Sequence, residues 1–215
     1  MAKKDKKNKK QSKKKEAKKE RKKKYQLAKN KKVVKKDKKK WVIIVSPKEF
    51  RNAIIGETHT SDPNKSINKI MSTNMMTLTG DPKKQNIIIY FKIISIKEGK
   101  LQTETIGFDT SKPYLKRIYK RAKAKVEYSF VTKTKEGKEV RIKPVIISKA
   151  KATNSILTAI QKTSKESLIK ALESRDFSDT MISILKGELP HQVKVESKKI
   201  FPITSVLIKS IKIIK

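Results

Sequence analysis

The residues that precede Trp41 carry so much positive charge and so little apolar surface that they constrain the fold more than any other feature. Residues 1–40 hold 23 lysines and arginines against four acids, a net charge of +19, and apart from Met1 their only sizeable apolar side chains are Tyr25, Leu27, Val33 and Val34. Self-repulsion opposes compaction, and no core offsets the entropy lost on folding. We therefore predict a disordered, lysine-rich N-terminal extension over residues 1–40.

The remaining residues, 41–215, have the composition of a folded domain. They are numerous enough to enclose one hydrophobic core, so we predict a single domain over this range. The whole chain carries 57 Lys plus Arg against 20 Asp plus Glu, a formal charge of +37, and such a chain needs a polyanionic partner. No apolar run approaches the roughly 20 residues that cross a bilayer, and we expect a soluble, intracellular protein that binds no membrane.

The residue types present argue against catalysis. The chain has no cysteine, which excludes disulfides, thiol catalysis and cysteine-ligated metals, and its two histidines, His59 and His191, are far apart in the sequence. Asp62 and Asp81 each precede a proline, where aspartate makes turns, and Asp109 lies just before a helix start. No phosphate-binding or dinucleotide motif occurs. We predict that the protein is not an enzyme and has no catalytic residue, metal site, cofactor or small-molecule substrate.

The pattern of apolar residues predicts strands first and helices later. The most apolar run, 87–96, is rich in β-branched and aromatic residues and is predicted to be a strand buried on both faces. The tetrapeptide Lys-Glu-Gly-Lys recurs at 97–100 and 135–138 and is predicted to form the turns of two hairpins. A stretch around Gly56 and Asp62–Asn64 is predicted to be irregular. The remaining predicted strands are 41–45, 101–106, 126–132, 140–147 and 204–214.

Helical periodicity dominates after residue 154. Apolar residues recur at three- and four-residue steps from there to Leu172, and a second helix starts near Asp176 and stops at Gly187. Pro190 is compatible with the start of a third helix, although residues 193–195 fit a short strand equally well. The predicted class is α+β, with a mainly antiparallel, β-barrel-like core, C-terminal helices and a returning strand.

A helix predicted at residues 111–124 is the best candidate for binding nucleic acid. Ser111 fits its N-cap and Pro113 its first turn, and an apolar stripe leaves the basic residues on the remaining surface. A rigid row of cations suits a phosphate backbone. Tyr114, Tyr119 and Phe108 fit either base stacking or the core, with the core favoured. With two lysines after the last hairpin, the predicted RNA-binding residues are Lys112, Lys116, Arg117, Lys120, Arg121, Lys123, Lys149 and Lys151.

An ordered set of short motifs, spread over about residues 40–210, resembles one protein family. The set is Trp41-x5-Pro47-x2-Phe50, Ile55-Gly56-Glu57-Thr58, Asp62-Pro63, Leu78-Thr79-Gly80-Asp81, Gln85, Tyr90-Phe91-Lys92-Ile93, Gly107-x-Asp109, Tyr114, Lys186-Gly187-x-Leu189 and Lys198-Lys199-Ile200-Phe201-Pro202. It is similar to the eS1 (also written S-three-a) family of small-subunit ribosomal proteins, found in archaea and eukaryotes. The Leu-Thr-Gly-Asp and Tyr-Phe-Lys-Ile stretches look more like archaeal members.

The resemblance implies a β-barrel-like domain with helices on the platform of the small ribosomal subunit, near the messenger exit. Its implied partners are small-subunit ribosomal RNA, neighbouring ribosomal proteins and messenger RNA near the exit, and its implied location is the cytoplasm. The chain departs from the family where lysines replace arginines, at residues 110–114 and at Lys149 and Lys151. Lysine keeps the charge but loses bidentate contacts with phosphate.

Two other functions fit the same charge. A free, sequence-indifferent RNA- or DNA-binding protein, such as a chromatin protein or an RNA chaperone, would need no ribosome. A polybasic tether to anionic membranes would use residues 1–40 alone, but this segment has no lipidation signal or apolar face. Co-sedimentation with small subunits distinguishes the first alternative, and liposome flotation distinguishes the second.

Overall fold

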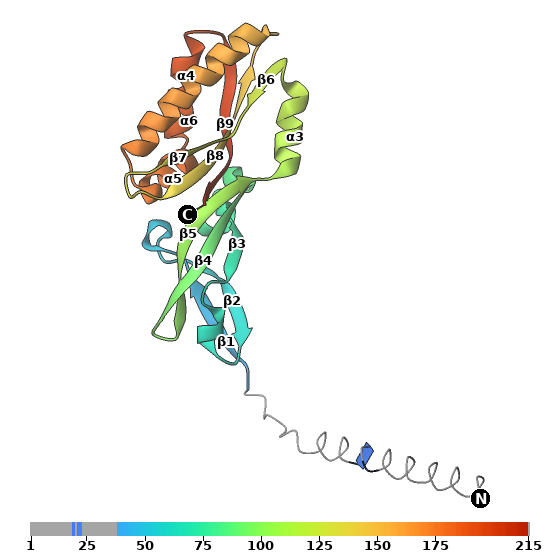
Figure 1. Cartoon of the computed structure of the whole chain (residues 1–215), viewed down its shortest axis with the longest axis vertical. Coiled ribbons are helices and arrows are strands. Elements are labelled where there is room, and N and C mark those ends of the chain that lie inside the picture. The colour runs from blue at the N-terminus through green and yellow to red at the C-terminus, as the bar shows by residue number, and fades with distance from the viewer. Residues whose placement is uncertain (1–18, 20, 23–37, 215) are drawn as a thin grey trace, which may run out of the picture. The chain divides into compact units, whose positions relative to one another are not determined.

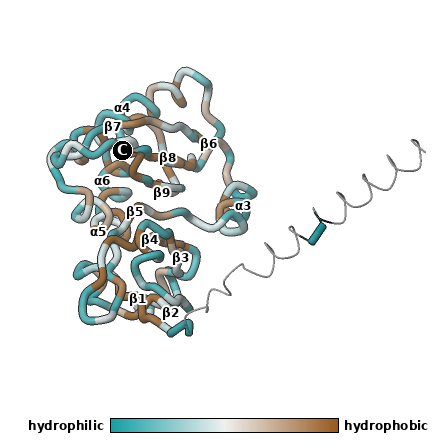
Figure 2. Tube along the Cα trace, turned by 60° about the horizontal axis from the view of Figure 1, so that its bottom comes forward, coloured by the Kyte–Doolittle hydropathy of each residue, from teal (hydrophilic) through white to brown (hydrophobic). Residues whose placement is uncertain are grey.

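The computed structural model describes residues 19, 21, 22 and 38–214. The chain divides into two units, Met1–Lys38 and Lys39–Lys215. The extension predicted over residues 1–40 falls almost entirely outside the described residues, so its disorder stays a prediction. The helices and strands of the second unit are shown in Figures 1 and 2.

Five strands form one half of a nine-stranded sheet. In β4 the side chains of Ile89, Phe91 and Ile93 point into the core, whereas Ile94 is 47% exposed. The prediction that this strand is buried on both faces is therefore wrong, because its second face is left partly open to solvent. Only β1 and β5 pair in parallel here; the other pairs are antiparallel. The strands are β1 (Lys40–Val45), β2 (Ile54–Thr60), β3 (Ile70–Asn74), β4 (Ile87–Lys97) and β5 (Lys100–Thr110).

Four further strands form the other half. The long strands β8 (Glu139–Ser148) and β9 (Ile203–Ile213) pair antiparallel along nearly their full length. The opposite edge of β8 pairs with two short strands in succession, β6 (Ala124–Glu127) and β7 (Phe130–Lys133). The sequence predicted one strand at 126–132, but the chain leaves the sheet at Tyr128 and Ser129. Both Lys-Glu-Gly-Lys segments form turns, with Gly99 and Gly137 in the left-handed conformation.

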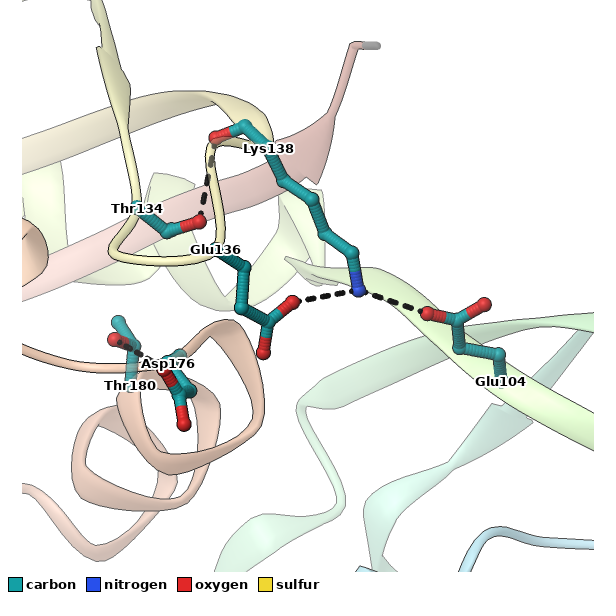
Figure 3. Close-up of polar contacts among 6 residues, drawn as sticks. All are labelled: Glu104, Thr134, Glu136, Lys138, Asp176 and Thr180. Carbon is teal, nitrogen blue, oxygen red and sulfur yellow. Dashed lines mark hydrogen bonds and ion pairs between the residues drawn. The ribbon is translucent and has the colours of Figure 1, made fainter.

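The two halves meet where β5 pairs with β9, from Gly107↔Lys212 to Asp109↔Ser210. A second link is the ammonium group of Lys138, which lies after the β7 strand (Figure 3). It is 3.1 Å from Oε1 of Glu104 on β5 and 2.8 Å from Oε2 of Glu136. The hydrogen bond that Lys138 donates to Glu136, with the one to Glu104, raises the pKa of Lys138. The β5–β9 pairs and the ion pair with Glu104 join strands far apart in the sequence.

Three helices pack on the half that contains β8 and β9 (Figure 1). They are α4 (Asn154–Glu173), α5 (Phe177–Lys186) and α6 (Glu188–Lys198). Leu168, Leu172 and Met181 are almost fully buried and share one hydrophobic cluster with Ile142 and Ile211 of the sheet. Where the sequence allowed a short strand at residues 193–195, the chain is helical, and Val193 is buried in this cluster.

The stretch predicted to be irregular is more regular than expected. Strand β2 runs through Gly56, and β3 leads into the short helix α2 (Met75–Thr79). Asp62 and Asp81 do begin turns, as predicted, because each precedes a 3-10 helix that starts at a proline. The 3-10 helices among the described residues are η1 (Lys48–Phe50), η2 (Pro63–Ser66) and η3 (Pro82–Lys84).

The predicted α+β class is confirmed, with its mainly antiparallel sheet, C-terminal helices and returning strand β9. The strand pairs run in an open order from β2 to β6, with β3, β4 and β7 attached at the sides. A second, smaller hydrophobic cluster is formed by side chains of β1, β4 and β5, namely Val42, Ile44, Ile93 and Leu101. The larger cluster extends through both halves, since it joins Ile89 and Phe91 of β4 to residues of β8, β9 and the C-terminal helices, and the smaller one supports the end of the sheet formed by β1, β4 and β5.

Candidate nucleic-acid interface

The predicted basic helix is α3 (Lys112–Arg121), which connects β5 to β6. Ser111 occupies its N-cap position, and the Ser111 amide donates a 2.8 Å hydrogen bond to the carbonyl oxygen of Asn86. After Arg121, Ala122 returns to an extended conformation and leads into β6. Because each end of α3 joins a strand of the sheet, the helix has a fixed place on one side of the domain (Figure 1).

The apolar stripe of α3 turns toward the protein, although it is only partly covered. Leu115 is buried, whereas Tyr114, Ile118, Tyr119 and Ala122 are half-buried. Of the five apolar residues of the stripe, Leu115 alone is buried. Phe108, the third aromatic considered for stacking, is 2% exposed and belongs to the core.

Polar contacts hold the end of α3 near the sheet. The Tyr119 hydroxyl donates a weak 3.5 Å hydrogen bond to Oε2 of Glu127 on β6, and the ammonium group of Lys125 lies 4.6 Å from the centre of the Tyr119 ring. Glu127 also binds Lys209 of β9 at 2.5 Å. Burial, followed by the charge of Glu127, raises the pKa of Tyr119, and the hydrogen bond with Lys209 lowers the pKa of Glu127.

All the charged residues on the outward surface of α3 are basic. Residues 111–125 contain seven lysines and arginines and no acid. Within the described residues, none of the helix's cations forms an ion pair, and Arg117 lies over the Tyr114 ring at 5.5 Å from its centre. Successive turns of a helix rise by about 5.4 Å, so residues four apart form rows along this surface. The exposed cations are Lys112, Lys116, Arg117, Lys120 and Arg121, and Pro113 is the one other exposed residue of the helix.

The other three predicted residues gather at the end of the sheet that α3 reaches. Lys123 precedes Ala124, which pairs with Ser148, and Lys149 follows Ser148 directly. The Ser148 hydroxyl lies 3.1 Å from the carbonyl oxygen of Ala124 and 2.7 Å from that of Ala150, which fixes this chain crossing. Lys123, Lys149 and Lys151 are all exposed. The structure thus continues the basic surface of α3 onto the β8–α4 connection.

Two further lysines reach the same place, and the sequence prediction of binding residues did not include them. The Lys149 amide donates a 3.0 Å hydrogen bond to the carbonyl oxygen of Pro202, just after the end of α6. Lys198 is the last residue of α6 and Lys199 follows it, and both are exposed. Their motif is visible in the sequence, but the chain separation of about 50 residues hides their nearness to Lys149. We call Lys123, Lys149, Lys151, Lys198 and Lys199 the loop cluster.

A cavity of about 330 Å³ opens beside the first turn of α3. Tyr114 and Phe108 line it together with apolar residues of α5 and β9, and Lys83, His191 and Lys194 lie among its lining residues. Within the described residues, no three potential metal-binding side chains gather at one place. The same residues include no helix with the length and apolar character required to span a bilayer.

Comparison with known proteins identifies the family to which the chain belongs. The model of the Ribosomal S3Ae family matches residues 27–215. The chain belongs to this family of ribosomal proteins. Among its relatives is the small ribosomal subunit protein eS1 of Saccharolobus islandicus (strain L.S.2.15), which is 32% identical over 82% of this chain and 85% of the relative. The eS1 proteins of Sulfolobus acidocaldarius and Saccharolobus solfataricus are 32% and 31% identical, each over 82% of this chain, and cover 90% and 85% of the relatives. The predicted family and its archaeal character are confirmed.

Proposed function

We propose that this protein is a structural constituent of the small ribosomal subunit, in the cytoplasm, and that it supports translation by binding small-subunit ribosomal RNA. The observation that carries the proposal is the surface of α3, where exposed cations without acidic partners occupy one side of a helix fixed at both ends. Membership of a ribosomal protein family makes ribosomal RNA the polyanion of choice. The role is structural, not enzymatic.

The α3 surface and the loop cluster form the proposed RNA contact. Lysine predominates in the chain, with 51 lysines and six arginines. Lysine binds phosphate as a point charge and does not read base edges in a bidentate manner, so the contact depends on the shape and backbone of the RNA. From the family resemblance we further propose that the protein lies on the platform of the small subunit, near the messenger exit. The same resemblance is the basis for proposing neighbouring ribosomal proteins and messenger RNA as partners. The basic residues 1–40 extend the contact as a separate segment.

Charge removal at α3 tests the proposal. We expect the substitutions Lys116→Ser, Lys120→Ser and Arg121→Ser, made together, to weaken association with small subunits. A matched variant changes Lys162, Lys165 and Lys170 to Ser, because replacing these exposed lysines of α4 removes the same charge elsewhere. Sedimentation of the tagged protein with ribosomal subunits at increasing salt measures the difference.

The outcomes are separable. Retention that is lost at lower salt for the α3 variant than for the α4 variant supports the proposed surface. Equal behaviour of the two variants would show that the wrong face was chosen. A protein that spreads over soluble RNA and chromosomal DNA, without following small subunits, would favour the free nucleic-acid-binding protein instead.

A further inference from the structure

An exposed aromatic pair lies at the start of β1, far from the α3 surface in the fold. Trp41 is the only tryptophan of the chain and is 68% exposed. Its ring stacks on that of His59 with centroids 4.9 Å apart and an angle of 27° between the planes. By contrast, the phenylalanines Phe50, Phe91 and Phe108 are buried. Exposing the large apolar ring of a tryptophan to water is unfavourable. The exposure of Trp41 therefore needs an explanation.

The fold holds this pair on an open surface. Trp41 and His59 are directly opposed in the β1–β2 ladder. Side chains alternate along a strand, so Val42 and Ile44 enter the smaller hydrophobic cluster while Trp41 points to the opposite face. Because β2 is the last strand in the order of the sheet, no further described strand pairs beyond His59.

The surroundings of the pair favour a polyanion over an apolar partner. Lys39 and Lys40 immediately precede Trp41 and are exposed. Since β1 and β5 run parallel, the β4–β5 turn lies at the same end of the sheet and brings exposed Lys97 and Lys100. The acids at this end of the described residues are Glu57, opposite Ile43, Glu98 in the turn, and Asp62, which forms an ion pair with Lys65.

The nearest large exposed aliphatic side chain on the same two strands does not extend the pair into a continuous apolar patch. Ile54 is 61% exposed but pairs with Val45, four residues from Trp41, or about 13 Å along the strand. Exposed Glu57 lies between them. An isolated aromatic surface flanked by lysines matches the sites that bind single-stranded nucleic acid, where a base stacks on a ring and cations follow the backbone.

We propose that the Trp41–His59 pair is a stacking platform for an unpaired base of single-stranded RNA, with Lys39, Lys40, Lys97 and Lys100 contacting the flanking phosphates. This inference rests on the proposed function for the identity of the polyanion. It adds a second contact that recognises a base surface, whereas the α3 surface recognises phosphates. One face of the Trp41 ring contacts His59, and its high exposure leaves surface for a base.

Tryptophan fluorescence tests the platform directly, because Trp41 is the sole source of the signal. The full chain is titrated with a single-stranded RNA of about eight nucleotides, and separately with inorganic polyphosphate of equal charge, in about 0.2 M salt. We expect RNA to quench the emission, because a stacked base contacts the indole, and polyphosphate to leave it nearly unchanged. Equal quenching by both polyanions, or no quenching by RNA, would overturn the proposal.

Variants give an independent measure. Trp41→Ala is expected to weaken binding of the labelled RNA by about five- to 150-fold, the range for loss of one stacked base. Val131→Ala, which removes another exposed apolar side chain from β7, is expected to leave the affinity unchanged. If Trp41→Ala and Val131→Ala bind the RNA with equal affinity, the stacking platform is refuted. If the tryptophan emission of the natural protein shifts only when small-subunit proteins are added, the Trp41–His59 pair binds a protein partner and not RNA. Retained sedimentation of Trp41→Ala with small subunits would separate failure of the platform from failure of the proposed function.

Discussion

Gly107 occupies the joint between the two halves of the sheet, and a single methyl group there is expected to open the joint. Gly107 of β5 pairs with Lys212 of β9. A Cβ atom at this position would lie 2.0 Å from the carbonyl oxygen of Ile211 and 2.9 Å from its carbonyl carbon. Contacts between such atoms are normally about 3.5 Å, so the strands must separate by more than about 1 Å. Both contacts are with backbone, which no side-chain rotation can relieve.

The energetic cost depends on how many strand pairs would break. The β5–β9 ladder spans only Gly107↔Lys212, Phe108↔Ile211 and Asp109↔Ser210. At a net value of about 0.5–1.5 kcal/mol for each hydrogen bond, loss of this ladder lowers the free energy of unfolding by about 2–4 kcal/mol. For a domain of this size, that corresponds to a decrease in Tm on the order of 5–15 °C.

Urea unfolding of Gly107→Ala measures this cost, with Gly56→Ala as the control. Gly56 also lies in a strand, but an added Cβ would meet only the end of the Met71 side chain, at an ordinary 3.5 Å. The control is expected to change the unfolding free energy by no more than about 1 kcal/mol, because alanine also restricts the unfolded chain. If both variants unfold at the same urea concentration, the close approach of β5 and β9 is not what holds the halves together.

Two further predictions concern the extension and a half-buried tyrosine. Deletion of residues 1–40 should leave the domain folded but flatten the plot of log affinity for RNA against log salt, by about 0.7–0.9 for each phosphate that the extension neutralises; an unchanged slope refutes the role of the extension. Burial raises the pKa of Tyr128 to about 12, and its hydroxyl lies 2.6 Å from that of Ser164. The neutral phenol is thus favoured in the folded state, so the stabilisation is present below about pH 10 and is lost as the pH rises toward about 12. Relative to Tyr128→Phe, the natural protein should lose on the order of 1–2 kcal/mol over that interval in unfolding measurements, and parallel curves would contradict the shift.

Local patterns in the sequence predicted the elements well where one physical rule dominated. The helical period located α3, α4 and α5, and the repeated Lys-Glu-Gly-Lys turns located two hairpins. Around Gly56 the turn-forming residues concealed β2, because its stability comes from pairing with β1 and not from its own residues. The exposure of Ile94 was not predicted for a related reason, since composition alone does not say whether a second layer covers a strand.

The residues of the candidate interface were likewise predictable only where local sequence determines their position. The cations of α3 were identified because a ten-residue helix places them on one surface by its own geometry. The contribution of Lys198 and Lys199 depends on the hydrogen bond between Lys149 and Pro202, which joins distant parts of the chain. The stacking of Trp41 on His59 likewise depends on the register of β1 and β2, which no residue pattern specifies over a connection of this length.

The distribution of acids explains why the uncompensated charge appears on α3. Glu104 binds Lys138, Asp109 binds Lys212 and Glu127 binds Lys209, and each of these acids lies on a strand of the central sheet. These three acids neutralise lysines that the fold brings close to them. The six acids between residues 166 and 196 lie on or between α4, α5 and α6, away from α3 in the sequence. The segment 111–125, with no acid of its own, therefore keeps its full positive charge on the surface. Repulsion among those cations is only partly screened by salt and is relieved further when a polyanion lies against them, so the uncompensated charge of this surface is itself the reason to expect RNA there.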